Sequence, residues 1–441
     1  MSRGWHWISL LCFWLAAAMD AQPADTANFI RPQGLPQATR DIIWADFLGV
    51  NTPLLFYPRA QYQQQLQMLR RLGLRWVRVD LHWDVIEPKP GQFRLDLLDP
   101  LFTDLQQAGF EPLVYLVGSA PFASSAATNA PFRDQYPPGN PADYALRLAQ
   151  LAQRYPQVRH WQVWNEPNLP PFWRPQADAG AYARLLQASA QALPRGKLVP
   201  AGMAYYSQLP HAQQTLMLEQ LHALGALQLS DVVAYHPYSD TPEGDPDLDN
   251  PDNFIERAQQ LNLRLRAAGV KQIWATEFGW STYRGPLEMQ TQIDERQQAN
   301  YLLRRLLLMM SLDYERVFWF CLQDIDKIVG ERDRHYGLIY ADAQPKPAWF
   351  ALQRLLQISG ERLAPQPPLV VADGVYASSW RRPDGRSLSL FYARQPTDIS
   401  MPASKAAQIY QPLDGSSQRL MPVGGKLQLR ATPELQLLLL D

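Results

Sequence analysis

The stretch QLQMLRRLGLRWVRVDLHW, residues 65–83, contains an amphipathic helical pattern, a glycine and an apolar strand pattern in that order. Gly73 lies where a helix C-terminus favours a residue in the left-handed conformation, so it predicts a helix-to-strand junction. Residues 102–118 and 261–280 repeat this order, with Gly109 and Gly269 at their junctions. The strands that follow are continuously apolar, which is typical of parallel strands buried under helices on both faces.

Eight segments of the chain have the composition of such strands, and helical patterns separate them. They span residues 48–51, 76–81, 111–117, 158–164, 198–201, 232–235, 273–276 and 316–320, and a last helix is expected near 346–358. Eight strand-helix units in about 320 residues match a (β/α)₈ barrel with long loops. A doubly wound sheet shares this pattern, but the sequence contains neither G-x-G-x-x-G nor a Walker-type loop. We therefore predict an α/β fold, a TIM barrel over residues 40–360.

The chain changes character after Gly360. Short alternating or apolar runs follow, separated by Asp-Gly, Pro-Asp-Gly and Gly-Gly turns. Such runs predict a small all-β domain, sandwich-like, over residues 361–441. The extended segment 28–37 is a candidate additional strand of this domain.

The N-terminus has the pattern of an export signal. Arg3 precedes an apolar run from Trp5 to Met19, which ends in small residues, Ala16-Ala17-Ala18. Residues 1–21 are therefore expected to be a signal peptide or, if uncleaved, an N-terminal membrane anchor, although about fifteen apolar residues are short for a membrane span. We expect a periplasmic or secreted protein, with inner-membrane attachment as the alternative.

The overall composition favours a neutral partner. The chain has 41 Lys and Arg against 42 Asp and Glu, scattered along its length, so no charged surface favours nucleic acid or an anionic membrane. Fourteen tryptophans suit stacking on sugar rings, although packing in a large core explains them equally well. Because Cys12 lies in the candidate leader and Cys321 is the other cysteine, no internal disulfide is expected. We expect a monomer.

Two glutamates close predicted barrel strands. Glu166 follows the fourth strand and Glu277 the seventh, and the active sites of such barrels gather at the C-terminal strand ends. An ionised side chain is costly to bury without a partner, so two carboxylates at one rim call for an explanation. Glycoside hydrolysis needs a carboxylic acid and a carboxylate, about 5 to 5.5 Å apart when configuration is retained. The alternative is a pair of unrelated loop carboxylates.

Residues near these glutamates have chemistry that suits a sugar site. The alternation in R-V-D-L-H places Arg78, Asp80 and His82 on one face, and Arg78 either keeps the nucleophile ionised or forms a structural ion pair. Asn165 can bind a sugar hydroxyl, with a turn residue as the alternative. Other candidates are His236 and Tyr238, to orient a carboxylate or the sugar, and the stacking platforms Trp319, Trp173 and Phe172, for all of which a structural role is the alternative.

Three motifs resemble a known family. V-W-N-E-P-N-L-x-x-F-W, A-Y-H-P-Y and W-A-T-E-F-G-W are similar to those of the clan of retaining (β/α)₈ glycoside hydrolases, and residues 165–173 resemble glycoside hydrolase family 39 most. The resemblance covers about residues 45–350, and a small β-domain is also typical of that family. Loop 119–141 departs from the xylosidases of the family.

The resemblance implies roles for individual residues. It makes Glu166 the acid/base, Glu277 the nucleophile and Asn165 the hydroxyl-binding residue, with Arg78 and Tyr238 positioning the nucleophile. Chain length, export signal and glutamate placement also resemble the exopolysaccharide endoglycosidases of biofilm-forming bacteria.

These observations predict a retaining glycoside hydrolase, endo-acting on a neutral exopolysaccharide. Two alternatives stay open: an exo-acting, xylosidase-like β-glycosidase on oligosaccharides, and a catalytically silent polysaccharide-binding barrel. A metal-dependent hydrolase is disfavoured because the seven histidines show no H-x-H or H-E-x-x-H spacing. No metal and no cofactor are expected, so activity should survive EDTA.

Overall fold

The structure is a computed structural model that describes residues 35–194, 196–205, 216–245, 250, 252–286, 290–326, 331–369 and 371–441. The candidate leader, residues 1–21, and residues 28–34 of the candidate extra strand lie outside the described residues. In the described part of the chain, the helices are too short or too polar to cross a membrane.

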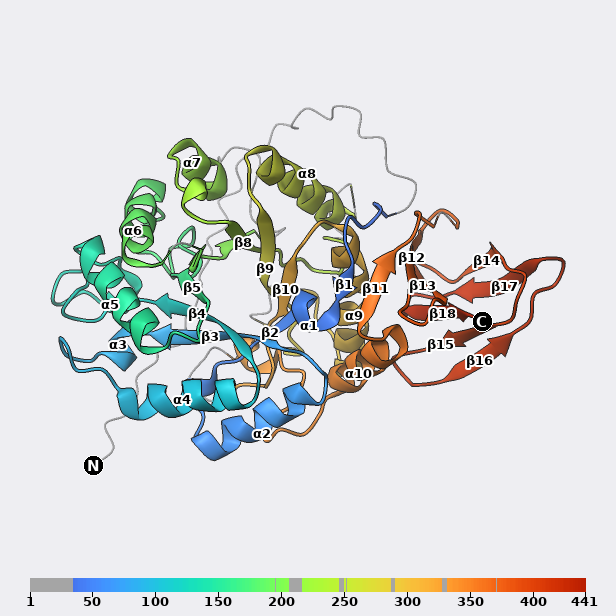
Figure 1. Ribbon diagram of the computed structural model, residues 1–441, viewed down its shortest axis with the longest axis horizontal. Coiled ribbons are helices and arrows are strands. Elements are labelled where there is room, and N and C mark those ends of the chain that lie inside the picture. Colours follow the sequence, from blue (N-terminus) through green and yellow to red (C-terminus); the bar gives the residue numbers. More distant parts are fainter. Residues whose placement is uncertain are drawn as a thin grey trace.

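The larger part of the molecule is a closed parallel barrel with an outer layer of helices (Figure 1). Its fifth strand has two parts, β6 (Leu198–Pro200), which pairs with β5, and β7 (Met203–Ala204), which pairs with β8. The other strands are β2 (Leu48–Asn51), β3 (Trp76–His82), β4 (Glu111–Val117), β5 (His160–Val163), β8 (Val232–His236), β9 (Gln272–Phe278) and β10 (Arg316–Trp319). Because β10 pairs in turn with β2, the ring closes. The predicted (β/α)₈ barrel is confirmed, and each predicted strand overlaps an observed one.

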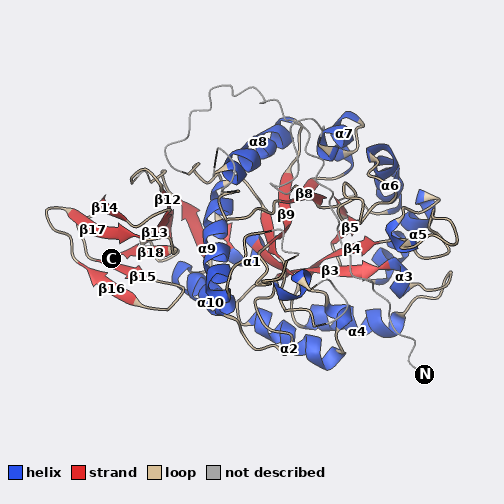
Figure 2. Ribbon diagram, turned by 180° about the vertical axis from the view of Figure 1, so that it is seen from behind, coloured by secondary structure: helices blue, strands red, loops and turns tan. Residues whose placement is uncertain are grey.

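The helices lie outside the strands (Figure 2). They are α1 (Trp44–Phe47), α2 (Arg59–Arg70), α3 (Trp83–Ile86), α4 (Leu95–Gln107), α5 (Pro141–Arg154), α6 (Ala179–Ala192), α7 (Met217–Ala223), α8 (Asn253–Ala267), α9 (Glu295–Ser311) and α10 (Pro347–Ser359). Gly73, Gly109 and Gly269 follow α2, α4 and α8 with φ of 72°, 76° and 86°. The predicted left-handed junctions are therefore confirmed.

Alternate residues of each strand point into the barrel. In β3, Val77, Val79 and Leu81 pack in the main core, whereas Trp76 belongs to a separate buried cluster with inward residues of other strands. The members of that cluster are Trp76, Leu113, Val199, Val232, Ala234, Trp274 and Phe318. Since side chains two positions apart share a face, Arg78, Asp80 and His82 lie on the same inner face as Trp76, nearer the C-terminal end of the barrel.

Aromatic and basic side chains close the opposite, N-terminal end of the barrel. The guanidinium of Arg316 lies 3.6 Å from the ring centroid of Trp76 and 4.3 Å from that of Trp274. The His160 ring contacts the same two indoles, at centroid distances of 5.3 and 5.2 Å. Burial, together with the positive charge of Arg316, lowers the pKa of His160 to about 4. This imidazole is therefore neutral in the folded protein at neutral pH.

The neutral His160 should make the protein sensitive to acid. Below about pH 6.5 the unfolded chain binds a proton at this position that the folded chain does not bind, so the free energy of unfolding falls toward pH 4 and the contribution levels off below it. We expect His160→Leu to flatten this fall by at most about 1.4 kcal/mol per pH unit. Urea unfolding between pH 4.5 and 7 measures the slope, and an unchanged slope would contradict the expectation.

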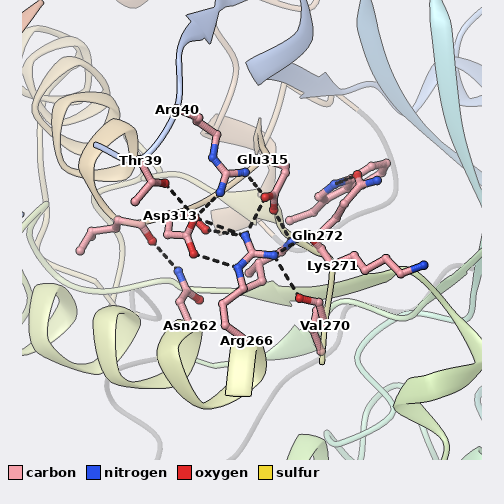
Figure 3. A network of polar contacts seen from close by, with 12 residues as sticks. Thr39, Arg40, Asn262, Arg266, Val270, Lys271, Gln272, Asp313 and Glu315 are labelled. Carbon is pink, nitrogen blue, oxygen red and sulfur yellow. Dashed lines mark hydrogen bonds and ion pairs between the residues drawn. The ribbon is translucent and has the colours of Figure 1, made fainter. Parts of the chain in front are cut away.

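A network of ion pairs joins Arg40, which precedes α1, to the starts of β9 and β10 (Figure 3). Arg266 of α8 contacts Asp313 at 2.8 Å and Glu315 at 2.6 Å, and Arg40 pairs with both carboxylates. Glu315 also accepts a 2.6 Å hydrogen bond from the backbone of Ile273. The network therefore stabilises the N-terminal end of the barrel, away from the C-terminal strand ends.

The C-terminal residues form two packed antiparallel sheets beside α9 and α10 (Figure 1). The larger sheet has the order β1-β11-β12-β13-β18-β15-β16, and the smaller one is the pair β14-β17. The strands are β1 (Ile42–Ile43), β11 (Arg362–Pro365), β12 (Val375–Arg381), β13 (Ser387–Ala393), β14 (Thr397–Pro402), β15 (Ala407–Tyr410), β16 (Ser417–Leu420), β17 (Lys426–Ala431) and β18 (Gln436–Leu440). The predicted all-β C-terminal part is confirmed. The N-terminal strand of this sheet is β1, however, and residues 35–37 of the candidate 28–37 are not in a strand.

Candidate active site

Both candidate glutamates lie at the C-terminal end of the barrel. Glu277 is the sixth residue of β9, and Glu166 lies in the loop that follows β5, where its backbone N–H donates to the Gly202 carbonyl at 3.1 Å. Glu166 has a φ of 40°, in the left-handed region that non-glycine residues rarely adopt. Both residues are buried, at 2% and 7% exposure. The structure therefore brings together two buried carboxylates that lie over a hundred positions apart in the sequence.

The separation of the two carboxylates suits one class of reaction. One oxygen of Glu166, one oxygen of Glu277 and a ring nitrogen of His236 all lie within 4.8 Å of one another. Retaining glycosidases place their carboxyl groups about 5 to 5.5 Å apart, whereas inverting enzymes need about 6.5 to 9.5 Å to admit a water molecule. The geometry therefore matches a double displacement.

Arg78 connects the candidate residues to one another. Its fully buried guanidinium donates to Glu277 Oε1 at 2.5 Å and to Asn165 Oδ1 at 2.8 Å, and it stacks 3.9 Å from the ring centroid of Tyr115. This buried ion pair fixes the position of the Glu277 carboxylate and leaves Oε2 for the other contacts of the site. Because Arg78 occupies Oδ1 of Asn165, the Nδ2 amide is the group that Asn165 can offer to a sugar hydroxyl.

Tyr238 and His236 contact the carboxylates from β8 and the loop after it. The Tyr238 hydroxyl donates to Glu277 Oε2 at 3.1 Å. Nδ1 of His236 lies 2.7 Å from Glu166 Oε1, and Nε2 lies 3.0 Å from the Thr276 hydroxyl. Each of these two side chains therefore contacts one of the candidate catalytic groups directly.

The charge of His236 follows from its surroundings. Burial, opposed by the charge of Glu277 and assisted by that of Arg78, lowers the pKa of this imidazole to about 3. The ring is therefore neutral at neutral pH and carries one proton. In the tautomer with Nδ1–H donating to Glu166 Oε1, the other oxygen of Glu166 stays available to carry a proton, and Nε2 accepts from Thr276.

Gly202, between β6 and β7, leaves the space that His236 occupies. A Cβ atom at position 202 would lie 1.9 Å from His236 Nε2 and 2.5 Å from Thr276 Oγ1. We expect Gly202→Ala to displace the imidazole and lower kcat at least about fivefold, since a buried polar group left without its partner costs about 1 to 3 kcal/mol. The measurement compares kcat with the melting temperature, and Gly139→Ala, at an exposed position where the added Cβ would meet only ordinary contacts of 3.8 Å or more, is the control for substitution itself.

Several polar residues that support the site were not singled out from the sequence. Asn51 accepts from Arg78 at 2.9 Å and donates to the carbonyls of Thr276 and Trp319, and Gln162 accepts from Arg78 at 2.7 Å. Asn51 ends the otherwise apolar β2, and Gln162 lies between the apolar residues Trp161 and Val163 of β5. Because a buried polar group needs a partner, that interruption was the signal in the sequence.

His82 lies near the end of β3 in an acidic environment. Its Nε2 lies 3.3 Å from Asp80 Oδ2. Burial lowers the pKa of His82, but the hydrogen bond and charge of Asp80, with the charges of Asp84 and Asp134, outweigh it and raise the pKa. The structure thus places His82 and Asp80 on the inner face of β3 as expected, in contact with each other at the C-terminal end of that strand.

The aromatic candidates divide by their burial. Trp319 and Trp173 are packed in the core, where Trp319 donates to the Tyr336 carbonyl and Trp173 makes edge contacts with Trp164 and Tyr182, so their packing alternative fits best. Phe172 is half-buried. Phe320, which was not proposed from the sequence, is also half-buried and packs against Tyr238 beside the carboxylates.

Glu166, His236 and Glu277 are also close enough for one ligand atom of each to contact a single cation. The guanidinium of Arg78 already pairs with the carboxylate of Glu277, however. Hydrolysis of a glycosidic bond by two carboxyl groups requires no metal ion.

No protein-family model and no curated protein sequence matches the chain at a significant level. Solved structures do. A family 39 glycoside hydrolase from the gut symbiont Bacteroides cellulosilyticus WH2 has a TM-score of 0.70 at 19% identity, covering 89% of this chain and 80% of that one. A family 39 β-xylosidase from Caulobacter crescentus has a TM-score of 0.63 at 17% identity, covering 92% and 98%. A family 30 endoxylanase from Clostridium papyrosolvens C71 has a TM-score of 0.58 at 11% identity, covering 92% and 98%. The chain therefore has the fold shared by glycoside hydrolases of families 39 and 30.

Proposed function

We propose that the protein is a retaining glycoside hydrolase with Glu277 as nucleophile and Glu166 as acid/base. One observation carries the proposal: the two carboxylates lie at one end of the barrel, with oxygens within 4.8 Å of each other. The fold shared with structures of glycoside hydrolases is consistent with it. A pair of unrelated loop carboxylates would not require a shared neighbour, whereas Nδ1 of His236 lies 2.7 Å from Glu166 Oε1 and 3.7 Å from Glu277 Oε2.

The reaction takes two displacements. Glu277 attacks the anomeric carbon while the protonated Glu166 gives its proton to the departing oxygen, which leaves a glycosyl ester on Glu277. Glu166, now ionised, removes a proton from water, and the resulting attack on the anomeric carbon releases the sugar with retained configuration and restores both side chains.

We further propose that the substrate is a neutral exopolysaccharide cut at internal bonds. The balanced charge of the chain supports a neutral polymer, and the resemblance to exopolysaccharide endoglycosidases supports internal cleavage. The export pattern at the N-terminus supports a periplasmic or secreted location, with possible inner-membrane attachment. The exo-acting alternative is favoured by one finding, the fold shared with a structure described as a β-xylosidase.

Incubation with the exopolysaccharide of the source organism, followed by mass analysis, tests the proposal. Oligosaccharides as first products support internal cleavage, and single sugars support the xylosidase-like alternative. A 2-fluoro glycoside should add one sugar mass to the peptide containing Glu277, whereas a silent binding protein would gain no mass. Activity that EDTA removes and zinc restores would instead indicate a metal-dependent hydrolase.

A further inference from the structure

The loop that carries Tyr238, residues 237–245 after β8, is held by one buried arginine. Arg305 of α9 is fully buried, and its guanidinium reaches acceptors along the loop. It donates to the carbonyls of Pro237 at 2.8 Å, Pro242 at 2.9 Å and Thr241 at 3.2 Å, and to the Ser239 hydroxyl. Because these acceptors lie on both sides of Tyr238, the position of Arg305 determines the path of the backbone there.

Arg305 is itself fixed in place. Its guanidinium carbon lies 3.5 Å from the ring centroid of Phe254 and 5.1 Å from that of Trp280. The Trp280 indole N–H donates to the carbonyls of Ser239 and Asp240, at 2.9 and 3.0 Å. The loop is therefore bound from α9 and from the segment after β9 together.

The far end of the loop contacts the C-terminal β-domain. Glu243 is buried and pairs with Arg304, the neighbour of Arg305 on α9. Tyr392 of β13 donates its hydroxyl to Glu243 Oε1 at 2.5 Å, and the Arg304 guanidinium lies 4.6 Å from the centroid of the Tyr392 ring. A side chain of the β-domain thus completes the hydrogen bonds of a carboxylate in the loop that bears Tyr238.

The same β-domain surface also holds the start of α8. Tyr392 stacks on Tyr376 of β12, with ring centroids 4.7 Å apart. The hydroxyl of Tyr376 and the guanidinium of Arg394 both bind Asp252, which precedes α8. The connection from β8 to α8 is therefore attached to the β-domain at two described points, Glu243 and Asp252.

We propose that the β-domain is a positioning element of the active site, in which Tyr392, acting through Glu243 and the loop bound by Arg305, keeps Tyr238 in contact with Glu277. The catalytic role of Glu277 in this inference rests on the proposed function, whereas the control of the loop by Tyr392 does not. Tyr392 and Glu243 are positioning residues, since neither contacts the carboxylate pair.

The variant Tyr392→Phe tests this coupling because it removes one hydroxyl and keeps the aromatic stack. We expect kcat on 2,4-dinitrophenyl β-xyloside, β-glucoside or β-galactoside, whichever is turned over, to fall about 5-fold to 30-fold with little change in KM. Glu277 is faced by Arg78, His236, Tyr238 and Glu166. Among these contacts Tyr392→Phe weakens the one from Tyr238, so Tyr238→Phe should lower kcat at least as much as Tyr392→Phe does.

Two controls separate positioning from general damage. Tyr410→Phe makes the same change at a half-buried tyrosine of β15 and should leave kcat and KM unchanged. In a Tyr238→Phe background, Tyr392→Phe should lower kcat no further, because both changes act through one contact. If Tyr392→Phe is unfolded at the assay temperature, Glu243→Gln takes its place.

Hydrogen exchange gives a readout that does not need activity. Amides of residues 237–245 should exchange faster in Tyr392→Phe than in the wild type, and not in Tyr410→Phe. Unchanged exchange together with an unchanged kcat would overturn the inference. An active Glu277→Gln variant with faster exchange in Tyr392→Phe would overturn the proposed function while leaving the control of the loop by the β-domain in place.

Discussion

Glu277→Gln is expected to abolish turnover while the protein stays folded. The amide has nearly the same shape as the carboxylate, but it cannot form the glycosyl ester on which both displacements depend. The loss of kcat should exceed the about 10² to 10⁴-fold that general acid-base assistance alone contributes. Stopped assays on an activated aryl glycoside, together with the absence of 2-fluoro glycoside labelling, measure this effect.

A buried glutamate outside the site provides the matched control. Glu87, at the end of α3, accepts from Trp83 of that helix at 2.6 Å and pairs with Arg147 of α5 at 2.9 Å. These contacts join two helices and involve neither Glu166 nor Glu277. Glu87→Gln should lower the melting temperature because it weakens a buried ion pair, while turnover per folded molecule is kept. Full activity in Glu277→Gln would refute the assignment of the nucleophile.

Glu166→Ala is expected to affect substrates according to their leaving groups. A poor leaving group needs the proton of Glu166, so cleavage of the polymer should fall by about 10² to 10⁴-fold. A dinitrophenolate leaves without protonation, so formation of the glycosyl ester should be largely preserved and its hydrolysis should become rate-limiting. A burst of released phenol, measured before steady state, is the expected result.

Azide provides a direct check on this role. The truncation leaves space beside the glycosyl ester, so azide should accelerate turnover of the dinitrophenyl glycoside and give a glycosyl azide of retained configuration. Glu277→Gln should show no such rescue because its side chain is not shortened. Equal losses for good and poor leaving groups would contradict the acid/base assignment.

The sequence predicted the barrel because its signals are local. Gly73, Gly109 and Gly269 mark chain reversals that only a few residues determine, and continuous apolar runs mark strands buried on both faces. The interruption of the fifth strand at Gly202 was not predicted. Gly202 packs against His236, which belongs to another strand, and the local sequence does not reveal that contact. Likewise, the pairing of β1 with β11 depends on tertiary packing and not on the composition of two residues.

The site was predictable in its residue types but not in its contacts. Glu166 and Glu277 were found because charges at the ends of apolar strands are unexpected on physical grounds. The spacing in β3 placed Arg78 on the inner face, but its contacts with Asn51 and Gln162 require the curvature of the closed sheet. Whether Trp319 is accessible at the site or packed in the core was not predictable, because an indole in an apolar strand suits both positions.

The backbone at position 166 has a consequence for how this protein can change over time. A φ of 40° costs a side-chain-bearing residue about 1 to 3 kcal/mol, whereas glycine adopts it freely. Replacing Glu166 by glycine would therefore relieve this strain, and under the proposed function it would yield a more stable but inactive protein. Selection for stability alone would favour glycine at this position. The strained backbone of Glu166 therefore destabilises the fold, and a role of this side chain in bond cleavage would explain why it is kept.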